Sequence, residues 1–537
     1  MGIFEEIFKL PDDISLQKQT LEILESVSIN NYEQIRDIFE EFTNCLKLYI
    51  AQFPEKSIDI LENFIPKVDN EKNYKILIDC FTNLILHSNE KIRNQTLSDF
   101  SSCINSRLKS DDSSLYELGK NQIFWKYLIN QVLIPILPEL IKKISSLNYI
   151  INSNNINVVS ISQTIDTTNN NISNLDNSFD NLNQINSIKS TKKEKIEYCN
   201  TLENLLIKIA NIFNDFYSWN YKELNTFFES LEKIIFTEDE SIQNTGLECV
   251  KFLHGSERIK HKHFLQNFTL FLITLSNKSL EENFNSMNEN EISNLMKTKK
   301  NISIIDKNLS LCFIHFNILS LLDKLLSQYI NFLPDDILNK LLDCLEASII
   351  ISNNFNSNLQ LRYLITEYNK MVVNPLSSMV IWTDNNDVIN LFRQFQISIK
   401  NFFIIVEFLY SKENDINNKK RYYKRIMDVS IKIISNYSDK NKEFLILINN
   451  AENEKEYKEK EFELNNFVLP LCDYIFPTIQ KIEFYKYDKY RDIVSKILFD
   501  LILCYDQRIR EKIKDLLNVV FIKIFKSNNG KQNKGED

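Results

Sequence analysis

Residues 201–253 read TLENLLIKIANIFNDFYSWNYKELNTFFESLEKIIFTEDESIQNTGLECVKFL. In the first part of this stretch, apolar side chains recur at steps of three or four residues, which places them on one face of an α-helix. They are Leu202, Leu205, Leu206, Ile209, Ile212, Phe213 and Phe216. The same spacing returns after a short break at 218–220, in Leu224, Phe227, Phe228, Leu231, Ile234 and Ile235. Because so short a break leaves room only for a turn, the stretch predicts a helical hairpin.

A third helix is predicted to begin directly after this hairpin. Glu238-Asp239-Glu240 supplies carboxylates where a helix N-terminus favours them, and apolar positions such as Ile242 and Leu253 follow. A hairpin that exposes apolar faces is not stable alone, so neighbouring hairpins should stack on it. We therefore predict an all-α fold, an armadillo- or HEAT-like α-solenoid of stacked helical hairpins.

The overall composition agrees with helices rather than strands. The chain has 537 residues, too many for one compact core, and its hydrophobic content of 43% excludes wholesale disorder. Only 6 Gly and 9 Pro are present, too few for many β-turns or for Gly-rich phosphate loops. Five helices are predicted near the N-terminus, at 14–27, 32–50, 55–65, 71–87 and 90–108.

Three segments share a polar cap followed by Ile and a long polar residue. They are 88–93, 238–243 and 506–510. This pattern resembles the start of the second helix of a HEAT-type repeat. The alternative interpretation is chance, because helix caps in any helix-rich protein have similar sequences; we favour the solenoid.

The predicted domain organisation follows shifts in composition. The stretch 148–190 is dominated by Asn, Ser, Thr and Ile with few aromatic residues, which favours a disordered insertion. The other predicted parts are an N-terminal helical-repeat segment (1–147), central repeats (191–277), a polar loop (278–301), a C-terminal helical domain (302–526) and a disordered tail (527–537).

Charge and cysteine usage indicate a cytoplasmic protein. The net charge is -9 with Lys and Arg scattered among Asp and Glu, so we expect no nucleic-acid footprint and only indirect membrane attachment. The 9 cysteines include no CxxC pair and are expected to be reduced core residues. The N-terminus does not resemble a signal peptide, and no apolar run of about 18 residues predicts a membrane span.

The search for catalytic and metal-binding residues is negative. No GxxxxGK[ST], GxGxxG, GxSxG or HExxH string occurs. His254, His261 and His263 lie near one another in the sequence, but no Cys or acidic residue completes a metal-ligand pattern, which favours a solvated helix start. We therefore predict no catalytic, cofactor-binding or metal-binding residue, and no cofactor.

Two further groups have a functional and a structural interpretation. Asp335-Asp336 follow Pro334 and are interpreted as helix-capping groups rather than general acids. The three tryptophans could anchor a partner, but we favour packing in or near the core; they are Trp125, Trp219 and Trp382.

Several segments, in order along the chain, resemble the part of the large brefeldin-A-inhibited (BIG) Arf guanine-nucleotide exchange factors that lies downstream of their exchange domain. They are Ile92-Arg93 to Leu97, Phe124-Trp125, VLIPI (132–136), 201–216, Ser241-Ile242 with Gly246, Cys249 and Leu253, LLDCLE (341–346), Phe355-Asn356-Ser357 and Leu361-Arg362. The resemblance implies armadillo-like repeats used for regulation and recruitment at Golgi and endosomal membranes.

The resemblance also limits the functional expectation. The family's exchange domain has no counterpart here, so no catalytic residue carries over and we expect a non-enzymatic chain, either a stand-alone paralogue or a piece of a longer product. The resemblance implies an Arf-family GTPase or other trafficking proteins as partners. The alternatives are an unrelated cytosolic HEAT-repeat scaffold, such as a transport receptor, and an enzyme with an unrecognised helical active site.

Overall fold

The computed structural model describes most of the chain as α-helices. The described residues are 14–50, 52–111, 113–165, 175–281, 302–356, 359–372, 385–441, 458–459, 461–462, 464–481 and 507–532. Within these ranges every regular element is helical, which confirms the all-α prediction. The chain divides into two compact units, Met1–Glu257 and Arg258–Asp537.

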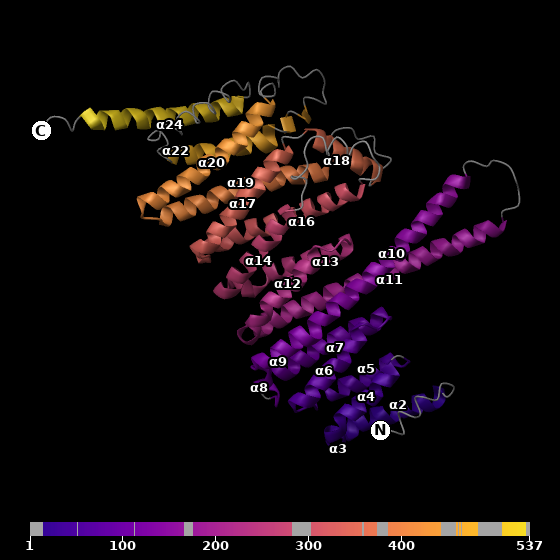
Figure 1. The fold of residues 1–537 in the computed structure, drawn as a ribbon. Helices are drawn as coiled ribbons and strands as arrows, with labels where there is room; N and C mark the ends of the chain where they lie inside the picture. The colour runs from indigo at the N-terminus through magenta and orange to yellow at the C-terminus, as the bar shows by residue number, and fades with distance from the viewer. Residues whose placement is uncertain are drawn as a thin grey trace. The chain divides into compact units, whose positions relative to one another are not determined.

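The first unit begins with helices that form where the sequence predicts them. They are α2 (Ile14–Asn30), α3 (Tyr32–Ile35), α4 (Phe39–Ile50), α5 (Pro54–Phe64), α6 (Glu71–Ile85) and α7 (Glu90–Leu108). Polar caps set the starts of two of them: Asn70 accepts a hydrogen bond from the backbone N–H of Asn73, and Asn89 accepts one from that of Lys91. Each helix packs mainly against helices near it in sequence, as stacked hairpins require (Figure 1).

The rest of the first unit is organised around one long helix, α11 (Leu175–Asn220), which is kinked at Phe216, where φ is -120° and ψ is 21°. Its elements are α8 (Tyr116–Gly119), α9 (Gln122–Tyr127), a π-helical turn (Leu128–Leu133), α10 (Ile134–Ile165), α11 (Leu175–Asn220), α12 (Leu224–Ile235) and α13 (Glu240–Gly255). α11 packs against α7, α9, α10 and α13. The hairpin predicted for 201–253 is present as α11 and α12, where the rings of Phe213 and Phe227 stack with centroids 5.4 Å apart.

The third predicted helix of that stretch begins with a side-chain cap. Asp239 accepts hydrogen bonds from the backbone N–H groups of Ser241 and Ile242 at the start of α13. The other carboxylate oxygen of Asp239 lies 2.8 Å from the Lys195 ammonium on α11. The acidic segment therefore caps its own helix and also joins it to the neighbouring one.

A buried arginine on α7 makes a second polar contact between helices, to α11. Arg93 on α7 is fully buried, and its Nε donates to Thr201 Oγ1 of α11 at 2.9 Å. Its Nη1 donates to the carbonyls of His87 and Ser88, and its guanidinium lies 4.0 Å from the ring centroid of Tyr198. Burial lowers the pKa of Arg93. Carbonyls and an aromatic face thus replace water around a charge that would otherwise be costly to bury.

The prediction of a disordered insertion at 148–190 is wrong at both ends of that segment. α10 continues to Ile165 and α11 begins at Leu175, and the two helices lie side by side (Figure 1). Ile151 and Ile188 are buried, and Lys195 Nζ donates to Asn148 Oδ1 at 3.2 Å. Composition misled because a helix that packs against a neighbour needs only a few buried apolar side chains, and a segment rich in polar residues can supply them. Residues 166–174 lie outside the described part.

The second unit is a stack of longer helices. They are α14 (Lys262–Glu281), α16 (Ile302–Tyr329), α17 (Asp335–Asn356), α18 (Leu359–Val372), α19 (Asn386–Lys412), α20 (Ile416–Asn441), a π-helical turn (Leu464–Val468), α22 (Leu469–Lys481) and α24 (Gln507–Gln532). Helix α16 packs against α14 and α19, and α19 also packs against α17. The core of this unit therefore lies where α14, α16, α17 and α19 meet.

One described helix contradicts the expectation that no segment is apolar enough to span a membrane. Residues Ile305–Phe332 have the length for it, with a mean hydropathy of 1.6 over 18 residues, and 56% of that window is buried inside the protein. The segment is the core helix α16 and the turn after it. Packing against α14 and α19 accounts for its apolar character.

Three predicted boundaries also differ from the structure. The division between the units falls after Glu257, inside the predicted central repeats, because α14 packs against α16 and α17. The predicted loop 278–301 begins too early, since Ser279 and Leu280 are buried on α14. The predicted tail 527–537 also begins too early, because α24 runs to Gln532. Residues 282–301, 482–506 and 533–537 lie outside the described part.

A small residue sets the closeness of α12 and α13. A Cβ on Gly246 would lie 2.8 Å from Ile235 Cγ1 and 3.0 Å from Ile234 Cγ2. We predict that Gly246→Ala lowers the unfolding free energy by about 1–2 kcal/mol, because overpacking outweighs the gain in helix propensity. Urea unfolding followed by circular dichroism measures the change.

Gly255 provides a matched control on the same helix. A Cβ there would meet nothing within 4 Å. Gly255→Ala should leave stability unchanged or raise it by up to about 1 kcal/mol. Equal effects of the two substitutions would contradict the close packing at Gly246.

Candidate functional site

The histidines considered as metal ligands lie apart from any suitable ligand set. His261 and His263 are exposed, and His254 is half-buried. His261 Nε2 lies 3.2 Å from Arg258 Nη1, and His263 Nδ1 lies 3.2 Å from Asn267 Nδ2. Among the residues that the structure describes, no three His, Cys, Asp or Glu side chains are grouped to hold a metal ion.

The acidic pair lies at a helix N-terminus, and the described tryptophans are buried or half-buried. Asp335 and Asp336 are exposed in the first turn of α17, where carboxylates stabilise a helix N-terminus. Trp125 is fully buried: its Nε1 donates to the carbonyl of Gly119, and its ring lies 4.7 Å from that of Phe216. Trp219 is half-buried, and Trp382 lies outside the described residues.

Eight cysteines lie within the described part, and all are free thiols. Seven are buried, and only Cys199 is partly accessible. Burial raises the pKa of the Cys80 and Cys103 thiols to about 12 and that of Cys199 to about 11. A thiol with a raised pKa carries little thiolate, so none of these three is an activated nucleophile.

A buried polar network that the sequence analysis did not identify lies in the core of the second unit. His315 of α16 is at its centre and is 0% exposed. Its Nδ1 lies 3.0 Å from Ser279 Oγ and 3.3 Å from Ser276 Oγ on α14, and its Nε2 lies 2.8 Å from Ser348 Oγ on α17. The network therefore joins three helices through one imidazole.

Two further contacts extend the network. Ser348 Oγ lies 2.7 Å from Ser398 Oγ on α19, and Cys344 Sγ donates to Ser276 Oγ at 3.0 Å. Ser279 Oγ donates to the carbonyl of Ser276. A neutral His315 with its proton on Nδ1 then donates to Ser279 and accepts from Ser348, which satisfies both ring nitrogens.

The distance between His315 and Ser348 is that of a general base and its nucleophile. The pair nevertheless lacks the solvent access, the pKa and the orienting carboxylate that such a catalytic pair needs. Both side chains are 0% exposed, so a substrate has no access to them. Burial lowers the pKa of His315 to about 3, which removes its ability to take up a proton near neutral pH. No carboxylate among the described residues bonds the imidazole, as an orienting group would. The network therefore stabilises the helix packing.

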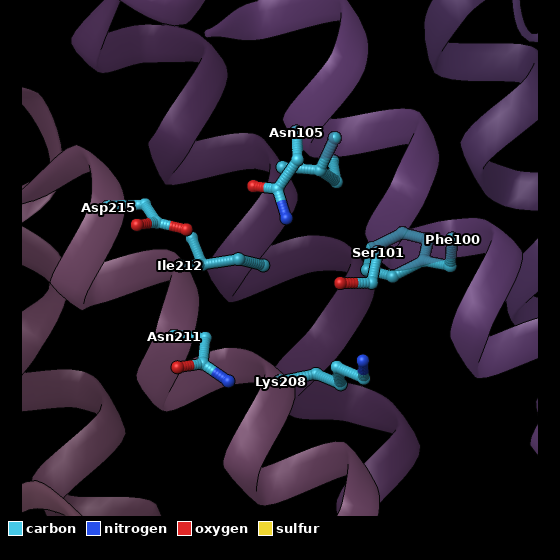
Figure 2. A pocket seen from close by; sticks show the side chains of 8 residues that line it. Phe100, Ser101, Asn105, Lys208, Asn211, Ile212 and Asp215 are labelled. Carbon is cyan, nitrogen blue, oxygen red and sulfur yellow. The ribbon is translucent and has the colours of Figure 1, made fainter.

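The first unit has a shallow cleft between α7 and α11. Figure 2 shows the side chains that line it, which are Phe100, Ser101, Ile104 and Asn105 of α7 and Lys208, Asn211, Ile212 and Asp215 of α11. The space inside it is about 10 Å³, far below the roughly 300–1,000 Å³ typical of small-molecule sites. Asp215 also pairs with Lys109 at 3.1 Å. The cleft is too small for a cofactor.

A group of ion pairs joins α17 to α20 on the surface of the second unit. Arg425 of α20 pairs with Asp343 and, through Nε, with Glu346 of α17 at 3.1 Å. Lys432 Nζ lies 3.6 Å from Glu346 Oε1. Asp343 and Glu346 belong to the LLDCLE segment quoted above, whose Cys344 points instead into the His315 network.

Comparison with protein families identifies the C-terminal part of the chain. Residues 313–518 match the family model described as the BIG2 C-terminal domain. The match confirms the resemblance to BIG-type exchange factors for this part, and it includes the LLDCLE and Leu361-Arg362 segments. The segments before residue 313 lie outside the match.

Other comparisons give only remote similarities. No curated protein matches the chain. A crystal structure of SYS-1 is 12% identical, with 96% of this chain and 99% of that chain covered and a TM-score of 0.18. A structure of Kap95p binding to RanGDP is 11% identical, with 100% and 70% covered and a TM-score of 0.18.

The buried His315 should make the second unit sensitive to acid. Its folded pKa, about 3, lies below the ordinary value of 6.5. Stability from the neutral imidazole is therefore fully present above about pH 6.5 and is lost as the pH falls toward 3, by up to about 1.4 kcal/mol per pH unit. We predict that His315→Asn is less stable at pH 7 but loses less stability between pH 7 and pH 5.

The control for this prediction is Ser348→Ala. It removes one partner of His315, at a cost of about 1–3 kcal/mol, but keeps the titrating imidazole and hence the pH slope. Hydrogen exchange of α16 amides at both pH values measures the local stability. Identical pH slopes for the wild-type protein and His315→Asn would exclude His315 as the source of the acid sensitivity.

Proposed function

We propose, from the premise that residues 313–518 carry a BIG2 C-terminal domain, that this chain is a non-catalytic regulatory and scaffold component of an Arf guanine-nucleotide exchange system. In this proposal it supports Arf-dependent vesicle traffic at Golgi or endosomal membranes through protein–protein contacts. The family match is the observation that carries the proposal, since the BIG2 C-terminal domain is a non-catalytic region of Arf exchange factors.

The geometry of the described helices supports a binding role. Stacked hairpins expose the outer faces of many helices, which gives a partner an extended surface for many weak contacts. The polar cluster around His315 is buried in the core of the second unit, where His315 and Ser348 are not accessible to a substrate. A scaffold needs both features, a rigid core and an accessible exterior.

The partner of this surface is proposed to be an Arf-family GTPase or another trafficking protein. The location that fits such a partner is the cytoplasm, with peripheral association at Golgi or endosomal membranes. A second candidate is an unrelated cytosolic HEAT-repeat scaffold, such as a transport receptor. The observation that favours it is that residues 1–312 lie outside the family match.

A nucleotide-release assay tests the non-catalytic part of the proposal. The purified full chain, added to an Arf-family GTPase loaded with fluorescent nucleotide, should leave the release rate unchanged, while a BIG-type exchange domain as positive control accelerates it. The reason for this expectation is that the exchange domain, the part of the BIG-type family that displaces the nucleotide, has no counterpart in this sequence. Acceleration by the chain alone would disprove the non-catalytic assignment.

Imaging and pull-down from cells test the trafficking part. The tagged chain should concentrate at Golgi or endosomal membranes and should retain an Arf-family GTPase or a trafficking protein. A diffuse or nuclear distribution, together with the absence of such partners, would favour the unrelated scaffold.

A further inference from the structure

The first half of α20 is unusually basic. Residues 419–425 read KKRYYKR, so five of seven positions carry a positive charge. The net charge of the whole chain, -9, conceals this local run of Lys and Arg. Clusters of this kind on an amphipathic helix are a recognised signal for anionic lipid.

The burial pattern of α20 separates its basic residues from its core face. The buried positions are Ile426, Met427, Val429, Ser430 and Ile433, and the helix packs against α17 and α19. Lys420, Arg421 and Lys424 are exposed. At 3.6 residues per turn these three positions fall within an arc of about 100° on the opposite side. We call this arc the basic face of α20.

One acidic residue, the half-buried Asp428, lies on the same side of α20 one turn after Lys424, so three cations and one carboxylate leave the basic face with a net positive charge. The other acidic residues nearby have partners outside the basic face. Asp343 and Glu346 pair with Arg425 at the edge of α20, and Glu346 also with Lys432. Glu413 and Asp415 accept hydrogen bonds from backbone N–H groups in the turn before α20. No ion pair joins Lys420, Arg421 or Lys424 to another residue in the described ranges.

The turn between α19 and α20 places cations over aromatic rings. Lys419 Nζ lies 4.9 Å from the ring centroid of Tyr410, and Lys412 Nζ lies 3.9 Å from that of Phe408. Both rings are half-buried. Half-buried aromatic rings beside Lys and Arg are the side chains that sit well at the boundary between lipid headgroups and water.

We propose that the basic face of α20 binds the anionic headgroup layer of a lipid bilayer. The surface of a helix is convex, so it contacts a planar headgroup layer along one stripe. The long, flexible Lys and Arg side chains can follow headgroups that move within this layer. Nucleic acid fits less well, because it needs a broad basic footprint on a chain whose net charge is -9. The basic face gives the protein a direct membrane contact, contrary to the indirect attachment expected from sequence.

The strength of this contact follows from the number of exposed cations. Each Lys or Arg near an anionic membrane strengthens binding by roughly fivefold, so three together contribute roughly 100-fold. The contact should weaken with salt because exposed charges are screened over about 10 Å at 0.1 M ionic strength. It is independent of the proposed function, since it requires neither an Arf GTPase nor an exchange domain.

Co-sedimentation of the purified full chain with vesicles tests the proposal. The chain should bind vesicles in which roughly a third of the lipid is phosphatidylserine, and it should not bind phosphatidylcholine alone. The triple variant Lys420→Gln, Arg421→Gln, Lys424→Gln should lose roughly 100-fold in affinity. Because the vesicle assay contains no GTPase, its result does not depend on the result of the nucleotide-release assay, and the two proposals can fail independently.

A matched control changes the same charge on another helix. Lys189, Lys192 and Lys193 are exposed on α11, and their replacement by Gln removes three positive charges from the first unit. That variant should bind vesicles as the wild-type chain does, and circular dichroism should show both variants folded.

Three results would overturn the proposal. The first is equal binding of the wild-type chain to phosphatidylserine-containing and phosphatidylcholine vesicles. The second is unchanged vesicle binding by the α20 variant. The third is binding of polyglutamate, but not of vesicles, that is lost in the α20 variant, which would assign the basic face to an acidic protein segment.

Discussion

The first unit depends on the burial of α11 against helices from both earlier and later parts of the chain. An α-helix satisfies its backbone hydrogen bonds internally, so helices associate only through their side chains. Leu202, Leu205, Leu206, Ile209 and Phe213 are each 0% exposed, which is possible only because several helices pack around α11. Removing any neighbour would return part of this apolar surface to water.

Polar contacts then determine how the neighbouring helices are positioned along α11, which apolar burial alone does not specify. Apolar faces slide easily past one another, whereas a buried donor must meet its acceptor or lose stability. Arg93 reaches Thr201 across the α7–α11 contact, and Lys195 pairs with Asp239 across the α11–α13 contact. These contacts specify how α7 and α13 are placed on α11.

The second unit uses a neutral network for the same purpose. His315 contacts serines from α14 and α17, and Ser348 of α17 in turn contacts Ser398 of α19. A small hydroxyl and a neutral imidazole cost less to bury than an ion pair, since no charged group has to leave water. The residues that match the BIG2 C-terminal domain, 313–518, include His315, Ser348 and Ser398, whereas Ser276 and Ser279 lie before them.

The sequence by itself determined the helical class, the positions of the early helices and the hairpin at 201–253, because the spacing of apolar residues follows directly from helix geometry. It also contained the segments whose resemblance the family match confirmed after residue 313. Only the tertiary structure decided that 148–165 and 175–190 are helical and that α14 belongs with the second unit. Only the fold brought Ser279, His315 and Ser348 together and turned three cations of α20 outward. The physical reason is that local spacing fixes which residues share a face of one helix, whereas burial, pKa and partners depend on which helix covers that face.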